Sequence, residues 1–259
     1  MEVRARVQIP YTSQMSKRAL VLQGGTMRGA FLVGALKTIH RLLGVNYFDA
    51  IFATSVGVFE QAFFASNQIY IMENTWSKYV HGNQLINFLN PLKRKPVLDL
   101  DYLVDLFQSD KSMLDIKAMR ESHPNLYVFV ADYKTKNLSV LDLKKNDIFQ
   151  AMKATCALPF LYPKKVILND KRCGDCWMAP KQKLQELLQS NLTDYDQILA
   201  ITTNKDSWLK GISHIIRPTK NILRYPFDTD RYRIIQTIKQ GETDTEKFII
   251  DHNLVNVKI

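Results

Sequence analysis

The segment FDAIFATSVGVFEQAFF (residues 48–64) places a serine between an apolar run typical of a buried strand and one typical of a helix. A serine at the tip of a sharp strand-to-helix turn is exposed to solvent, as is the nucleophile of hydrolases with a G-x-S-x-G motif. The positions two before and two after the serine must be small. Gly57 meets this requirement, and Ala53 adds only one methyl group. Ser55 is therefore a candidate nucleophile, and the alternative is a serine that only caps the helix.

A glycine-rich loop, GGTMRG, lies between an earlier apolar run and another helical pattern. Its residues are Gly24, Gly25, Thr26, Met27, Arg28 and Gly29. Backbone N–H groups at a helix start have no partner within the helix, and the helix dipole adds positive potential there. Such a loop can hold a phosphate or the oxyanion of an acyl-transfer intermediate. No Lys-Ser or Lys-Thr pair follows, which excludes a P-loop, and a plain tight turn is the alternative.

A serine nucleophile needs a base that accepts its proton. The five histidines lie in helical faces, loops or the polar C-terminal part, so a Ser-His-Asp triad has little support. They are His40, His81, His123, His214 and His252. The segment CGDCWMAP offers a carboxylate, Asp175, which can act as the base if it lies within hydrogen-bond reach of the hydroxyl.

The same segment contains a C-x-x-C pair, Cys173 and Cys176, a pattern that thiol oxidoreductases use. A zinc site needs a second pair of Cys or His ligands, and Cys156 alone does not supply it. A thiol oxidoreductase therefore stays open as a second kind of enzyme. No metal site is expected.

The elements that must position these residues alternate between apolar runs and helical spacings, which predicts an α/β fold with a mostly parallel sheet covered on both faces. Strands are expected at residues 19–25, 48–54, 125–133, 136–143 and 196–204, and helices at 28–44, 56–74 and 230–241. Residues 83–110 are expected to be loop-like. A single domain is predicted over residues 1–259, with a core at about 17–205 and a C-terminal appendage at about 210–259.

Composition limits the class of protein and of partner. The chain has 259 residues, 46% hydrophobic and 23% charged, so a sizeable buried core is expected. Its net charge of +10 favours an anionic partner, either nucleic acid, an acidic membrane or a polyanionic substrate, unless the basic surface only maintains solubility. The sequence shows no apolar run of about 18 residues, no signal-peptide pattern and only three cysteines, so a cytoplasmic protein is expected.

Taken in order, these segments resemble the patatin-like phospholipases, most closely the short bacterial members. QGGTMRGAF is similar to the family's EGGGMRGAY, and the serine turn and the aspartate before a small residue follow in the family's order. Further segments that resemble the family are NPLKRKPVLDLDYLVD, VFVADYKTKN and MKATCALPFLYP. The similarity covers residues 17–205 and is looser beyond them.

The resemblance implies a three-layer α/β/α fold that hydrolyses a lipid acyl ester, of a phospholipid or lysophospholipid, without a cofactor. Ser55 matches the family nucleophile, Asp175 its activating aspartate, and the loop from Gly24 to Gly29 its oxyanion-hole segment. Arg28 either steers a phosphate head group or braces that loop, and bracing is the favoured role. The expected partners are the lipid substrate and an anionic membrane in peripheral contact, with no nucleic acid.

The chain departs from the family pattern at the site itself. Ala53 replaces the first glycine of the serine turn, Thr26 the third loop glycine, and Cys176 the glycine after the aspartate, and Val56 fills a position that is usually smaller. A threonine held at positive φ is strained, and losing one oxyanion donor costs about 10²–10³ in rate. An enzyme, and a slow one, is therefore expected. The alternative is a catalytically silent relative that still binds lipid.

Overall fold

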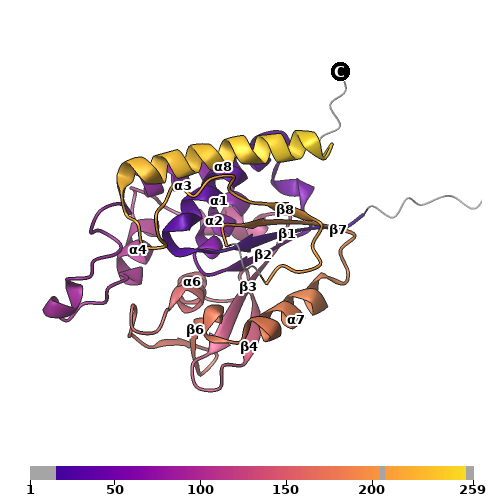
Figure 1. The fold of residues 1–259 in the computed structure, drawn as a ribbon. Coiled ribbons are helices and arrows are strands. Elements are labelled where there is room, and N and C mark those ends of the chain that lie inside the picture. Colours follow the sequence, from indigo (N-terminus) through magenta and orange to yellow (C-terminus); the bar gives the residue numbers. More distant parts are fainter. Residues whose placement is uncertain (1–15, 205–207, 255–259) are drawn as a thin grey trace, which may run out of the picture.

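The computed structural model describes residues 16–204 and 208–254, which form one eight-stranded sheet with helices on both faces (Figure 1). The strands are β1 (Arg18–Gln23), β2 (Ala50–Thr54), β3 (Asn125–Asp132), β4 (Leu138–Asp142), β5 (Val166–Leu168), β6 (Lys171–Asp175), β7 (Gln197–Thr202) and β8 (His214–Ile216). Their order is β5-β6-β3-β2-β1-β7-β8, and β4 pairs with β3. Strands β1, β2, β3, β7 and β8 are parallel, whereas β4, β5 and β6 make antiparallel pairs. The predicted α/β fold with a mixed, mostly parallel sheet is confirmed.

Helices cover the two faces of the sheet unequally (Figure 1). The helices are α1 (Gly29–Leu42), α2 (Gly57–Ala65), α3 (Ile69–Lys78), α4 (Leu100–Phe107), α5 (Ile116–Glu121), α6 (Ile148–Cys156), α7 (Lys181–Leu192) and α8 (Arg231–Asp251). The main core joins one face of the sheet to α1, α2, α3, α4, α6 and α8, and α7 packs on the other face. Helix α2 is buried all round, whereas α7 buries one stripe of leucines spaced four residues apart.

Three expectations about helices are wrong. The helix expected at residues 56–74 is two helices, α2 and α3, because Asn67 between them has a φ of 65°, which ends a right-handed helix. The region 83–110 is not all loop, because it contains α4, whose N-cap Asp99 accepts a hydrogen bond from the N–H of Tyr102. Helix α8 continues to Asp251, ten residues beyond the expected end at residue 241.

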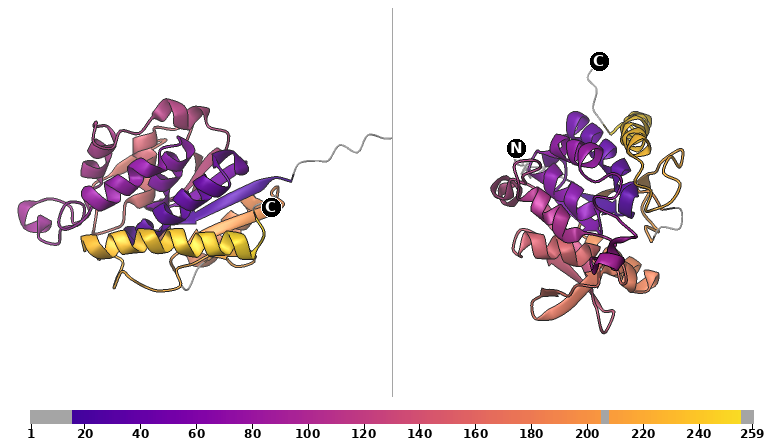
Figure 2. Two further views of the ribbon diagram at one scale, coloured as in Figure 1. Left: turned by 90° about the horizontal axis from the view of Figure 1, so that it is seen from above. Right: turned by 90° about the vertical axis from the view of Figure 1, so that its left-hand side faces the viewer.

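Helix α8 lies along α1 in unusually close backbone contact (Figures 1 and 2). A Cβ atom added to Gly34 would lie 1.9 Å from the carbonyl oxygen of Ile238, and one added to Gly241 would lie 2.3 Å from that of Phe31. Only glycine permits this approach of the two backbones. The C-terminal part therefore contributes to the main core, and a single domain remains our proposal. No helix within residues 16–204 and 208–254 is both long and apolar enough to cross a membrane.

Candidate active site

The register of the sheet brings Ser55 and Asp175 to the same place. Strand β4 occupies one edge of β3, so β2 and β6 must share the other edge. On that shared edge Ala53 is level with Val128, and Asp175 is level with Val130. A chain that continues two residues beyond Ala53 therefore arrives beside Asp175, and the residue at that position is Ser55.

Ser55 forms the sharp turn between β2 and α2. Its φ is 50°, in the left-handed region, which a serine adopts only under constraint from its surroundings. The constraint comes from α6, where the hydroxyl of Thr155 accepts the Ser55 N–H at 3.1 Å and donates to the carbonyl of Phe129 at 2.8 Å. Ser55 is half-buried at the start of α2, as expected of the nucleophile at such a turn. The helix-cap alternative requires a side-chain cap, and α2 has no side-chain cap hydrogen bond.

Asp175 is buried at the end of β6, where its carboxyl accepts a hydrogen bond from the N–H of Trp177 at 2.9 Å. Burial raises the pKa of Asp175 to about 6, although the Trp177 N–H, the Ser55 hydroxyl and the Cys176 thiol all act to lower it. At neutral pH the carboxylate is ionised and still basic enough to accept a proton.

The glycine-rich loop packs directly against the serine turn. A Cβ atom added to Gly24 would lie 2.8 Å from that of Ser55 and 2.9 Å from the backbone nitrogen of Val56. One added to Gly25 would lie 2.7 Å from the hydroxyl oxygen of Thr203. Side chains at either glycine would therefore displace the turn or its support, which explains the Gly pair in physical terms.

Not every N–H group of this loop can face a substrate. Met27 is buried, and its N–H donates to the carbonyl of Pro226 at 2.9 Å. The N–H of Arg28 donates to the carbonyl of Gly25 at 3.1 Å. Within the described part of the chain, the N–H groups of Gly25 and Thr26 have no acceptor, so these two are the candidate oxyanion donors.

Thr26 has a φ of 54°. The left-handed region is disfavoured for a β-branched residue and costs about 1–3 kcal/mol. The sequence predicts backbone strain if Thr26 has a positive φ, and this strain is therefore present. Arg28 is half-buried, and its guanidinium makes no hydrogen bond or ion pair with residues 16–204 or 208–254.

Two groups near the site were given no catalytic role from the sequence. Burial raises the pKa of the Cys156 thiol, at the end of α6, well above the usual value, although the Ser55 hydroxyl acts to lower it. Glu60 of α2 is fully buried, and burial raises its pKa to about 8. One of its oxygens accepts the indole N–H of Trp76 at 3.0 Å, and the other has no hydrogen-bond partner among the residues that the structure describes. The sequence does not predict these surroundings, because the neighbouring groups come from other elements.

The three cysteines are free and buried. Burial is the main cause that raises the pKa of both Cys173 and Cys176. A reactive dithiol site has the opposite property, a thiol pKa below the usual value. The geometry therefore gives the oxidoreductase alternative no support.

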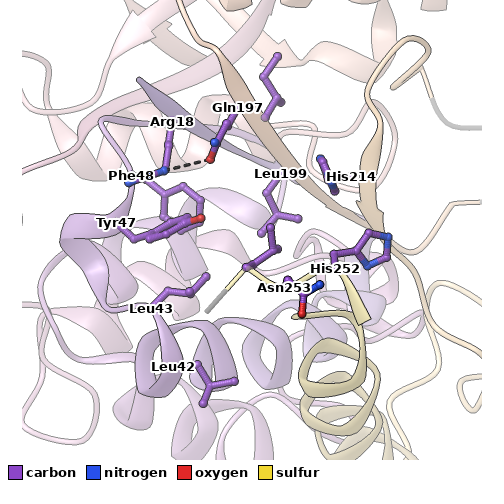
Figure 3. A pocket seen from close by; sticks show the side chains of 12 residues that line it. Arg18, Leu42, Leu43, Tyr47, Phe48, Gln197, Leu199, His214, His252 and Asn253 are labelled. Atoms are coloured by element: carbon purple, nitrogen blue, oxygen red, sulfur yellow. Dashed lines mark hydrogen bonds between the residues drawn. The ribbon is translucent and has the colours of Figure 1, made fainter. Parts of the chain in front are cut away.

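The described cavities lie away from Ser55. A cavity of 580 Å³ lies at the other end of the strands, where Arg18 begins β1 and Gln197 is the first residue of β7 (Figure 3). His214 and His252 line this cavity rather than the Ser55 turn. In the part of the chain that the structure describes, no histidine bonds to Ser55 or Asp175.

A family model described as patatin-like phospholipase matches residues 20–179. This chain belongs to the patatin-like phospholipase family. The match spans the glycine-rich loop, the serine turn and Asp175, and it confirms the resemblance inferred from the sequence. Patatin-like phospholipases are typically ester hydrolases. The catalytic roles of Ser55 and Asp175 in this member stay a prediction.

Two solved structures are similar to this chain at low sequence identity. The type III effector ExoU of Pseudomonas aeruginosa is 13% identical, with a TM-score of 0.50, over 92% of this chain and 54% of ExoU. VipD from Legionella pneumophila is 12% identical, with a TM-score of 0.49, over 92% of this chain and 67% of VipD. The chain thus spans about half the length of ExoU. No curated protein sequence matches significantly.

Proposed function

We propose that this chain hydrolyses the acyl ester of a phospholipid or lysophospholipid through a Ser55–Asp175 dyad. The observation that carries the proposal is the position of Ser55, on a strained strand-to-helix turn, beside the buried carboxyl of Asp175, whose pKa the Ser55 hydroxyl lowers. A nucleophile and a base within hydrogen-bond reach of each other are the minimum for nucleophilic acyl transfer. Family membership supports a lipid ester as the substrate.

The mechanism uses groups described above. Ionised Asp175 accepts the hydroxyl proton as Ser55 Oγ attacks the ester carbonyl, and the N–H groups of Gly25 and Thr26 bind the oxyanion. The start of α2 adds positive potential at the same point. Asp175 returns the proton to the leaving alcohol, which leaves an acyl-enzyme on Ser55. Water then attacks this intermediate with Asp175 again acting as the base.

The unpaired side chain of Arg28 is evidence for a substrate with an anionic head group. Its guanidinium is next to the oxyanion loop and has no partner in residues 16–204 or 208–254, so it is available to pair with a phosphate. The alternative role, bracing the loop, would require a hydrogen bond or ion pair from this side chain to its surroundings. The net charge of +10 also supports approach to an anionic membrane.

One observation favours the second candidate function, a catalytically silent lipid-binding protein. Thr26 is a proposed oxyanion donor and has left-handed backbone geometry that a threonine adopts only under strain. A small displacement of its N–H would weaken binding of the oxyanion without closing the site to lipid. The glycine-rich loop is therefore the part of the site where a small change in geometry would most easily abolish catalysis.

A fluorophosphonate probe tests the proposal, because it reacts with an activated serine and leaves a covalent adduct. We expect the adduct on Ser55 in the wild-type protein and none in Ser55→Ala. Ser190→Ala, which changes an exposed serine of α7, serves as the control and should keep the adduct. Lipid binding without an adduct in the folded wild-type protein would favour the silent relative.

A further inference from the structure

Five large apolar side chains are exposed in three segments of the chain: Phe88 (61% exposed), Leu89 (63%), Leu92 (85%), Phe160 (93%) and Trp177 (74%). Trp177 donates its N–H to Asp175. Phe160 lies in the loop that follows α6, the helix whose Thr155 holds Ser55. Scattered single apolar residues need no explanation, but three exposed ones within residues 88–92 indicate an interaction surface.

Three of the five belong to residues 83–98, which we call the docking loop. This segment between α3 and α4 projects from the body of the molecule in Figure 1 and in the left view of Figure 2. Its base is ordered by a bridge between Ile86 and Leu98 and by a hydrogen bond of 2.9 Å from the N–H of Asn87 to the carbonyl of Val97. Leu89 and Leu92 thus extend from a defined structure, the short 3₁₀ helix η3 (Asn90–Lys93) and its start.

The docking loop also carries a run of basic residues. Lys93, Arg94 and Lys95 are consecutive and exposed, and residues 83–98 contain no Asp or Glu. None of the three cations forms an ion pair with the residues that the structure describes. Apolar side chains beside unpaired cations complement an anionic bilayer, where acyl chains lie directly below the phosphates.

Contacts connect this loop to the candidate oxyanion loop. Leu98 donates its N–H to the carbonyl of Leu161 at 2.9 Å, beside exposed Phe160. The ring of Phe88 meets that of Phe227 edge to face, with 6.1 Å between centroids. The neighbouring Pro226 accepts the N–H of Met27. The docking loop is thus joined to the glycine-rich loop through Phe227 and Pro226.

We propose that the docking loop binds an anionic phospholipid bilayer by inserting Leu89 and Leu92 among the acyl chains while Lys93, Arg94 and Lys95 pair with lipid phosphates. This deepens the proposed hydrolysis, and it rests on that function for the identity of the substrate. A stable protein partner would need about 800 Å² on each side, more than a narrow projecting tip offers. A bilayer receives such a tip without a complementary groove.

Sedimentation with vesicles tests the proposal in a Ser55→Ala background, so that hydrolysis does not change the lipid. Leu89→Asp with Leu92→Asp should lower binding to phosphatidylglycerol-containing vesicles by about tenfold or more. The matched control is Tyr232→Asp with Ile250→Asp, two exposed apolar residues of α8, which should bind like the parent.

A second pair of variants tests the charges. Lys93→Ala with Lys95→Ala should lower binding by about fivefold per charge at low salt, and the difference should shrink as salt is added. Lys220→Ala with Lys239→Ala removes the same charge elsewhere and should have a smaller effect, since both lysines are exposed outside the docking loop. Pure phosphatidylcholine vesicles should bind weakly in every case.

A fluorescent residue in the docking loop guards against misfolded variants. Trp76 and Trp208 are buried, so in a Trp177→Phe background brominated lipid chains should quench the new indole of Leu92→Trp selectively. Docking-loop variants that bind like their controls, or a bound Leu92→Trp protein that is not quenched, would overturn the proposal.

The two proposals fail separately. Loss of vesicle binding in the docking-loop variants, with no hydrolysis of any ester by wild type, would support the docking proposal and contradict the proposed hydrolysis. Hydrolysis of a water-soluble ester, with vesicle binding unaffected by the docking-loop variants, would support the proposed hydrolysis and contradict the docking proposal.

Discussion

Ser55 lies level with Asp175 at the end of β2, and its hydroxyl lowers the pKa of the Asp175 carboxyl. In the part of the chain that the structure describes, no histidine bonds to either side chain. In a three-residue system the middle imidazole accepts the proton, whereas in the proposed dyad the carboxylate must accept it. The properties of Asp175 therefore determine how this site responds to mutation and to pH.

The losses of activity caused by substitutions at Ser55 and at Asp175 should not be additive. Ser55→Ala and Asp175→Asn should each lower kcat/KM for a water-soluble ester by about 10³-fold or more, and the double variant should be little worse than either one. Steady-state kinetics of the three proteins measures this. Losses that multiply in the double variant would show that the two residues act independently.

Activity should depend on the ionisation of Asp175. The carboxyl is a base only when ionised, so its pKa of about 6 predicts that kcat/KM increases as the pH rises through 6 and is constant above. A pH–rate profile on a water-soluble ester measures this. A profile that is flat across this range, or that falls with increasing pH, would exclude Asp175 as the base.

Glu60 should make stability depend on pH. Burial raises its folded-state pKa from the usual 4.5 to about 8, so the folded state holds this proton more tightly than the unfolded state. Its contribution is fully present below pH 4.5 and is lost as the pH rises through 8. Glu60→Gln should therefore gain stability relative to wild type as pH increases, by about 2–4 kcal/mol at the upper end.

Denaturant unfolding at several pH values checks the Glu60 prediction. Glu186→Gln changes an exposed glutamate of α7 and should show no pH-dependent gain. A constant difference between Glu60→Gln and wild type at all pH values would mean that Glu60 is not held in the protonated form.

Thr26→Gly should relieve backbone strain at the oxyanion loop. We expect stability to rise by about 1 kcal/mol and kcat to rise while KM changes little, because oxyanion binding acts in the transition state. Asp170→Gly, at another left-handed position in the turn between β5 and β6, is the control. It should alter stability slightly and leave kcat unchanged. A kcat that falls in Thr26→Gly would indicate that the threonine side chain assists the reaction.

Thiols should not be required for hydrolysis. Cys173→Ser with Cys176→Ser should keep most of the activity, because a serine hydroxyl can replace the Cys176 thiol as a hydrogen-bond donor to Asp175. Ester hydrolysis before and after the change measures this. Activity controlled by the cysteine pair and insensitive to Ser55→Ala would favour the oxidoreductase.

The sequence predicted the central strands well, because β1, β2, β3 and β7 are continuous apolar runs that end near glycine or polar residues. It did not predict β5, β6 or β8, which are short and partly polar. The approach of Asp175 to Ser55 depends on β6 pairing with β3 beyond the end of β2. That is a long-range register, which no local pattern in residues 171–175 contains.

Local backbone geometry was predictable only in part. The strain at Thr26 was predictable because Thr26 replaces a glycine of the loop motif. The end of α2 near Asn67 had only one sequence signal, the weak preference of asparagine for left-handed geometry. The support that Thr155 gives to Ser55 joins α6 to the end of β2. Such contacts appear only once the chain is folded.

The hydrogen bond from Met27 to Pro226 has a consequence for the order of events during synthesis. A nascent chain that has emerged as far as β6 already carries Ser55 and Asp175, but it lacks the acceptor for the Met27 N–H and the helix that packs on α1. The oxyanion loop gains its final support only after Pro226 and α8 have left the ribosome. We therefore expect the proposed hydrolysis to begin only after translation has passed this region.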